Sequence, residues 1–147
     1  GLRRLERGAR ISALLPIDLC VPAPGQGIIA VEVRQGDART AEMIRPIDDA
    51  SASVALRAER TVVDRLGGGC QMPIGAFAEL TARDTLSITS IVVSTDGSRS
   101  VRATMQGSVD APEQLGREAA DKLLADGADS ILAEARDVMS RTESHHQ

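Results

Sequence analysis

Aromatic residues are almost absent from this chain of 147 residues, which contains one Phe and neither Trp nor Tyr. Its core must therefore be built from Leu, Ile, Val, Ala and Met. Proteins that bind single-stranded nucleic acids stack the bases on aromatic side chains, and contacts with phosphates need a basic surface. This chain has a formal net charge of −4, so we expect no nucleic-acid partner.

Cysteine and histidine are scarce as well, with two of each. Cys20 and Cys70 are too few for a disulfide framework or a cysteine-rich zinc site, and His145 and His146 lie in a polar C-terminal segment. We therefore expect no metal site and a reducing, cytoplasmic location. No apolar run approaches the roughly 18 residues of a membrane span, so we also expect no membrane partner.

From residue 51 onward, the hydrophobic pattern predicts a small α+β domain with a three-stranded antiparallel sheet and helices on one face. A helix is expected over residues 51–66, ended by Gly67, and strands over 74–81, 86–93 and 99–105. Asp96-Gly97 predicts a hairpin between the last two strands. Asp110–Glu113 has the pattern of a capping box that opens a helix ended by Gly127, and Asp129 or Ser130 is expected to cap a final helix.

The residues before this domain have a different pattern. Residues 1–15 indicate the end of one helix and a short second one, and three prolines exclude a regular helix over 16–24. Residues 28–33 alternate and are rich in β-branched side chains, which predicts a strand. Asp37 is expected to cap a short helix that Pro46 ends, with a domain boundary near Asp48.

The stretch Gly25-Gln26-Gly27-Ile28-Ile29-Ala30 matches the glycine pattern of dinucleotide-binding loops. That loop needs a strand before the glycines and a helix after them, whereas here prolines precede and a β-branched run follows. Two other interpretations stay open at this point. The glycines either form a hinge whose backbone and Gln26 amide face a ligand, or they form a plain turn into the strand.

Cys70 follows three glycines in the stretch LGGGCQMPIG. It follows the C-terminus of the expected helix, where the helix dipole disfavours a thiolate, and the body of the chain has no histidine to act as a base. The residues leave two possibilities, a buried structural cysteine and a cysteine on a pliable loop that carries a group covalently.

The strings VPAPGQGIIAVEVR and ALRAERTVVDRLGGGCQMPIGAFAEL, followed by the Asp-Gly hairpin, resemble the C-terminal half of the porphobilinogen deaminase (hydroxymethylbilane synthase) family. The resemblance implies that residues 1–21 are the tail of the family's second domain. Residues 22–47 would form the hinge with a strand and helix of the first domain. Residues 51–141 would form the cofactor-bearing domain, with 142–147 as a polar tail.

The family joins four porphobilinogen molecules, with loss of ammonia, into hydroxymethylbilane. The resemblance implies a dipyrromethane cofactor bound to Cys70 through a thioether. Arg4 and Arg60 match carboxylate-binding arginines of the family. Gly25, Gln26 and Gly27 match the part of the hinge that faces the cofactor. Nearly all positive charges in the chain are arginines, a bias that fits either carboxylate binding or the base composition of the source genome.

The family's catalytic aspartate belongs to its N-terminal half, so we expect no catalytic residue in this chain. The first residue is Gly and not Met, from which we expect a piece of a longer chain. The resemblance implies that the whole enzyme is a monomer. Its partners would be porphobilinogen, pyrrole intermediates and the N-terminal half, without which we expect no activity. The alternative function is a free-standing α+β binding module without catalysis.

Overall fold

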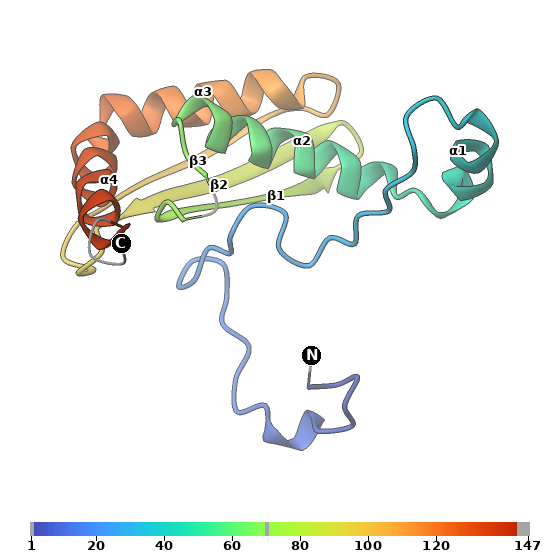
Figure 1. Ribbon diagram of the computed structural model, residues 1–147, viewed down its shortest axis with the longest axis horizontal. Helices are drawn as coiled ribbons and strands as arrows, with labels where there is room; N and C mark the ends of the chain where they lie inside the picture. Colours follow the sequence, from blue (N-terminus) through green and yellow to red (C-terminus); the bar gives the residue numbers. More distant parts are fainter. Residues whose placement is uncertain (1, 70, 144–147) are drawn as a thin grey trace.

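The computed structural model describes residues 2–69 and 71–143, with the side chains of 142 and 143 outside the description. Along the chain follow η1 (Gly8–Arg10), α1 (Ala38–Ile44), η2 (Arg45–Ile47), α2 (Ala50–Arg65), β1 (Ile74–Ala82), β2 (Thr85–Val93), β3 (Ser100–Ser108), α3 (Pro112–Ala125) and α4 (Ala128–Glu143). The described residues therefore form an α+β fold, as the hydrophobic pattern predicts (Figure 1).

The sheet is antiparallel in the order β1-β2-β3, with β2 at its centre. Every second residue of β2 is buried, because α2 and α3 pack on that face (Figure 1). The predicted hairpin joins β2 to β3, and Gly97 adopts the positive φ of 73° that its turn requires. In the described part of the chain, the buried core contains no aromatic side chain. It consists of aliphatic residues, among them Ala58, Val62, Leu86, Ile88, Val92, Leu115, Leu123 and Leu132.

Helix α2 is the element that sequence periodicity predicts best. Its buried face includes Ala55, Ala58 and Val62, and Gly67 follows it with a φ of 63°. The Asp49 carboxylate caps its N-terminus by accepting hydrogen bonds from the backbone N–H groups of Ser51 and Ala52. The helix thus begins one residue earlier than the pattern indicates.

The predicted capping box of α3 is wrong. Helix α3 begins at Pro112, its N-cap residue is Ala111, and no side chain caps it. The Glu113 carboxylate instead accepts two hydrogen bonds from the Arg57 guanidinium of α2, at 2.6 and 3.0 Å. An ion pair between α2 and α3 therefore takes the place of the expected cap within α3. The hydrogen bonds from Arg57 hold the pKa of Glu113 below its ordinary value.

Helix α4 also begins earlier than predicted, at Ala128. Neither of the expected caps, Asp129 and Ser130, stands before its first residue. Ala128 is fully buried, and the Ser130 hydroxyl donates to the carbonyl oxygen of Gly127. Gly127 has the positive φ, 98°, that the end of α3 requires.

The residues before α1 differ most from expectation. Where two helical pieces were expected, residues 2–15 contain only the short helix η1. The predicted strand over 28–33 is also wrong, because these residues form no strand and Ile29 is 86% exposed. A strand needs a neighbour, and no described residue pairs with this stretch. In Figure 1, the chain before α1 passes below the sheet and then leaves it toward α1. The α1 prediction is confirmed, since Asp37 caps that helix by accepting from the Thr40 N–H.

Candidate functional site

A cleft of about 520 Å³ lies between α2, the loop that follows α2, and residues 23–24. Its apolar lining comes from both ends of the loop and from α2. Polar groups enter from Arg60 and Asp64, one helical turn apart. Among the described residues, the lining comprises Ala23, Pro24, Leu56, Arg60, Val63, Asp64, Gly68, Gly69, Met72 and Ile74. An apolar cleft with a few polar groups is the usual form of a small-molecule site.

The loop over this cleft depends on its glycines. After Gly67, the Gly68 N–H donates to the carbonyl oxygen of Val63 and so closes the end of α2. A Cβ atom on Gly68 would lie 2.5 Å from the Cδ1 atom of Ile74, so a glycine lets the loop pass close over the start of β1. Cys70 lies outside the described residues, but Gly69 and Met72 on either side of it in the sequence both line the cleft.

The Arg60 side chain is exposed on the cleft. Two other arginines of the same helix are paired, Arg57 with Glu113 and Arg65 with Asp121. Among the described residues, the Arg60 side chain has no hydrogen bond or ion pair. Its guanidinium is therefore free to bind an anion, and arginine binds carboxylates with two parallel hydrogen bonds.

Residues 25–27 form a glycine turn at the outer edge of the cleft. Gly25 and Gly27 have positive φ values of 72° and 91°. The Gln26 side chain folds back on its own turn, where its Oε1 accepts from the Ala23 N–H at 3.1 Å. Residues 28–37, directly after the glycines, form no helix, so the turn lacks the helix N-terminus of a dinucleotide site. It is Ala23 and Pro24, rather than Gly25, Gln26 or Gly27, that line the cleft.

Sequence reasoning missed Glu59, which is buried on α2 with only 5% of its surface exposed. Its Oε2 accepts the Gly25 N–H at 2.7 Å, and its Oε1 accepts the Ala78 N–H of β1 at 2.8 Å. Burial raises the pKa of Glu59, and the two backbone hydrogen bonds oppose that rise. One signal was available, because a helical spacing places Glu59 on the same face as Ala55 and Val62.

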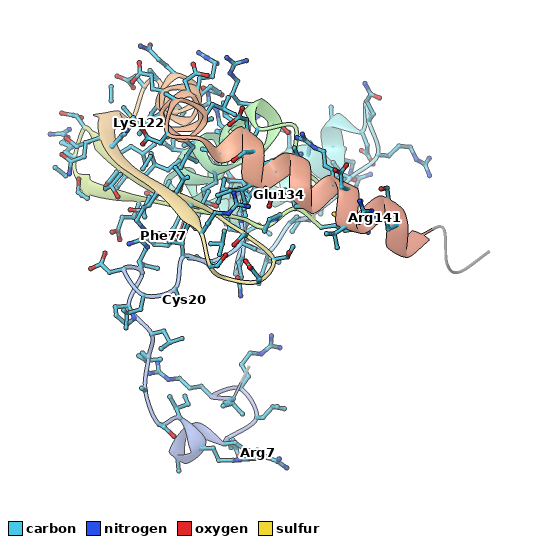
Figure 2. The ribbon with its side chains drawn as sticks, turned by 90° about the vertical axis from the view of Figure 1, so that its left-hand side faces the viewer. Arg7, Cys20, Phe77, Lys122, Glu134 and Arg141 are labelled. Atoms are coloured by element: carbon cyan, nitrogen blue, oxygen red, sulfur yellow. The ribbon has the colours of Figure 1, made fainter. Side chains whose placement is uncertain are left out.

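The structure does not bring Arg4 to the cleft. Arg4 is exposed in a turn of the N-terminal segment, and residues 2–10 lie far from the sheet (Figure 1). Figure 2 shows Arg7 at the far end of this segment and Cys20 between it and the sheet. Cys20 is exposed with a free thiol. The two predicted carboxylate-binding arginines are therefore separate in this arrangement.

Residues 17–22 attach the N-terminal segment to the sheet. The Arg102 guanidinium of β3 donates to the carbonyl oxygens of Ile17 and Asp18, both at 3.0 Å. The Ala76 N–H of β1 donates to the carbonyl oxygen of Pro22 at 3.0 Å. These contacts bring residues 23–24 to the cleft, next to α2.

Residues 2–69 and 71–143 contain no cluster of three or more His, Cys, Asp or Glu side chains that could hold a metal ion. In the same part of the chain, none of the helices has the length and apolar character needed to cross a membrane.

Comparisons with known proteins give one consistent result. Residues 54–125 match the family model "Porphobilinogen deaminase, C-terminal domain", and residues 1–42 match "Porphobilinogen deaminase, dipyromethane cofactor binding domain". The chain is 42% identical over 116 residues to the porphobilinogen deaminase of Carboxydothermus hydrogenoformans, covering 79% of this chain and 37% of that protein. It is 45% identical over 116 residues to that of Syntrophotalea carbinolica, covering 79% and 36%. It is 42% identical over 118 residues to that of Nitrosomonas europaea, covering 80% and 38%. The chain thus spans little more than a third of these relatives.

Proposed function

The chain belongs to the porphobilinogen deaminase family, and from that premise we propose that it is the cofactor-carrying C-terminal part of a hydroxymethylbilane synthase. The whole enzyme joins four porphobilinogen molecules into a linear tetrapyrrole and releases one ammonia for each. A cytoplasmic location and a monomeric whole enzyme are part of this proposal.

The observation that carries the proposal is the Arg60 guanidinium, which has no partner among the described residues and lies on an apolar cleft. Residues on both sides of Cys70 line this cleft. Pyrrole rings are flat and apolar, and those of this pathway carry carboxylates. Leu56, Val63 and Met72 offer surface for the rings, while Arg60 offers a partner for a carboxylate. The residues present therefore fit a dipyrromethane anchored at Cys70. When bound, that group supplies the primer to which pyrroles are added.

The residues of this chain bind and orient, and we assign the proton transfers to the N-terminal half. The two oxygens of Glu59 are occupied by backbone N–H groups, so this buried carboxylate is not free to serve a substrate. Asp64 lines the cleft but is exposed. An acid–base group that exchanges protons with pyrrole nitrogens works best where water is excluded. The cleft of this chain would need a second wall, from the N-terminal half, to exclude water. We therefore expect no activity from this chain alone.

Intact-mass spectrometry tests the anchor. The chain is produced together with the N-terminal half of a relative, and its mass is compared with that of a Cys70→Ala variant. We expect a mass increase of one dipyrromethane, absent in the variant, and formation of hydroxymethylbilane by the pair only. An unmodified thiol together with no product from the pair would refute the proposal.

One observation favours the alternative, a free-standing binding module. The hydrophobic core lies within α2, α3, α4, the sheet and the residues that join them, and none of its members comes from residues 2–37. Saturable binding of a pyrrole carboxylate without any adduct or product, even in the presence of the N-terminal half, would support the module.

A further inference from the structure

We propose that Glu59 is a positioning residue that holds residues 23–25 against α2 and thereby sets the outer wall of the cleft. The proposal rests on the proposed function only in assigning this cleft to pyrrole binding. Its structural part concerns three segments of the chain that meet at one carboxylate.

The geometry joins segments that are distant in sequence. Gly25 is 34 residues before Glu59 and Ala78 is 19 residues after it, yet the N–H groups of both point at its two oxygens, at 2.7 and 2.8 Å. Each oxygen has its own donor, so the carboxylate links the glycine turn, α2 and β1. Hydrogen bonds that involve a charged group are stronger than neutral ones, which suits a single contact that must hold a turn in place.

A carboxylate is a costly choice for this position if stability alone mattered. Glu59 is 5% exposed, and an apolar side chain of similar size on this face would avoid the loss of hydration. The raised pKa of Glu59 has that same cause. An apolar side chain cannot accept a hydrogen bond from the Gly25 N–H. It therefore cannot fix the direction in which the glycine turn leaves the sheet.

The wall of the cleft depends on this contact. Pro22 is tied to β1 by the Ala76 N–H, and Ala23 and Pro24, the next two residues, line the cleft. Gly25 then meets Glu59. A Cβ on Gly25 would lie 3.2 Å from the Cδ1 atom of Leu56, another lining residue, so the turn rests directly on α2. If the contact with Glu59 is lost, Ala23 and Pro24 are held from one side only.

Amide hydrogen exchange of the whole chain, followed by NMR, tests the contact. Glu59→Gln keeps the shape but leaves one acceptor oxygen for two N–H groups, so either the Gly25 or the Ala78 amide faces an NH₂ group and loses its acceptor. We expect exchange at the amide that loses its acceptor to become about ten- to a hundredfold faster. The Ile88 amide in the centre of the sheet should keep its protection, which shows that the variant is folded.

Glu79→Gln is the matched control, because Glu79 is the exposed neighbour of Ala78 on β1 and its side chain has no hydrogen bond or ion pair among the described residues. The same chemical change there should leave the Gly25 amide unaffected. Glu59→Asp is the second variant, in case Glu59→Gln does not fold. It keeps the charge, but it is one methylene shorter and cannot reach both amides.

A titration with porphobilinogen, followed at the Leu56 and Arg60 amides, separates positioning from simple support of the fold. We expect Glu59→Gln to weaken binding about tenfold while the protection of Ile88 is unchanged. Unchanged exchange at both Gly25 and Ala78 would overturn the contact, and a released Gly25 with unchanged affinity would overturn its role in the cleft. If the unaltered chain showed no binding, the proposed function would fail, and the exchange at Gly25 and Ala78 alone would decide the contact.

Discussion

Replacing Gly116 with Ala should destabilise the protein, although the same change usually stabilises a helix. Gly116 lies inside α3, where a glycine costs about 1 kcal/mol relative to alanine. In this fold, a Cβ on Gly116 would lie 2.4 Å from the carbonyl oxygen of Ala58 and 2.8 Å from the Cβ of Thr61. Both atoms belong to α2, and the carbonyl is part of its backbone, so no side-chain rotation relieves the contact.

The size of the effect follows from two opposing terms. Forcing an extra carbon into a packed contact costs about 1–3 kcal/mol, and a clash with helix backbone belongs at the upper end of that range. Subtracting the gain of about 1 kcal/mol in helix propensity leaves a net loss of about 1–2 kcal/mol. For a domain of this size, each kcal/mol corresponds to about 4–8 °C in melting temperature.

Urea unfolding followed by far-ultraviolet circular dichroism measures this loss, because the chain has no Trp or Tyr to report unfolding by fluorescence. Gly107→Ala in β3 is the matched comparison. Its added Cβ would meet the Cδ1 atom of Leu115 at 3.2 Å, a flexible side-chain end, and should cost less than the Gly116 change. The reasoning is refuted if Gly116→Ala unfolds at the same or a higher urea concentration than the unaltered chain, with the same slope.

Further outcomes follow from the same contacts. Hydrogen bonds from the turn serines lower the pKa of Asp96 from 3.8 to about 2. The stabilisation of the hairpin by the Asp96 carboxylate is therefore present above pH 3.8 and is lost as the pH falls toward 2. Asp96→Asn should abolish this acid dependence of amide protection in the hairpin. Arg60→Ala should weaken porphobilinogen binding about tenfold in an NMR titration, whereas Arg57→Ala, which breaks a pair outside the cleft, should leave it unchanged. Gly68→Ala should lower the melting temperature more than Gly69→Ala, since only the former adds a Cβ against an isoleucine methyl group of β1.

The sequence predicts the C-terminal domain well because its information is local. Alternation along β2 and the spacing of Ala55, Ala58 and Val62 on α2 identify residues that the structure buries. The same spacing places Glu59 on this buried face, but the sequence does not predict which groups its carboxylate contacts. Whether a carboxylate on an apolar face finds donors depends on Gly25 and Ala78, which reach it only after the chain has folded.

The candidate site shows the same division. Arg60 and the glycine loop before Cys70 were identified from the sequence, and the described parts of both line one cleft. Resemblance also grouped Gly25, Gln26 and Gly27 with the cofactor site, whereas in this arrangement the preceding residues, Ala23 and Pro24, form the wall. That grouping and the role of Cys70 remain predictions.

Residues 28–33 show why a correct pattern can fail to give its element. They are rich in apolar and β-branched side chains, as β2 is, yet β2 has a neighbour on each side and this stretch has none among the described residues. A strand is defined by backbone pairing with a neighbouring strand. The hydrophobic pattern of a sequence therefore indicates only which side chains are suited to a core. Ile29 and Val31 are suited to one and are exposed. Without a sheet, such an apolar, β-branched segment exposes unpaired backbone N–H and C=O groups, which can pair with a strand of another chain. Under the proposed function, the N-terminal half must therefore supply the pairing strand as well as the acid–base group.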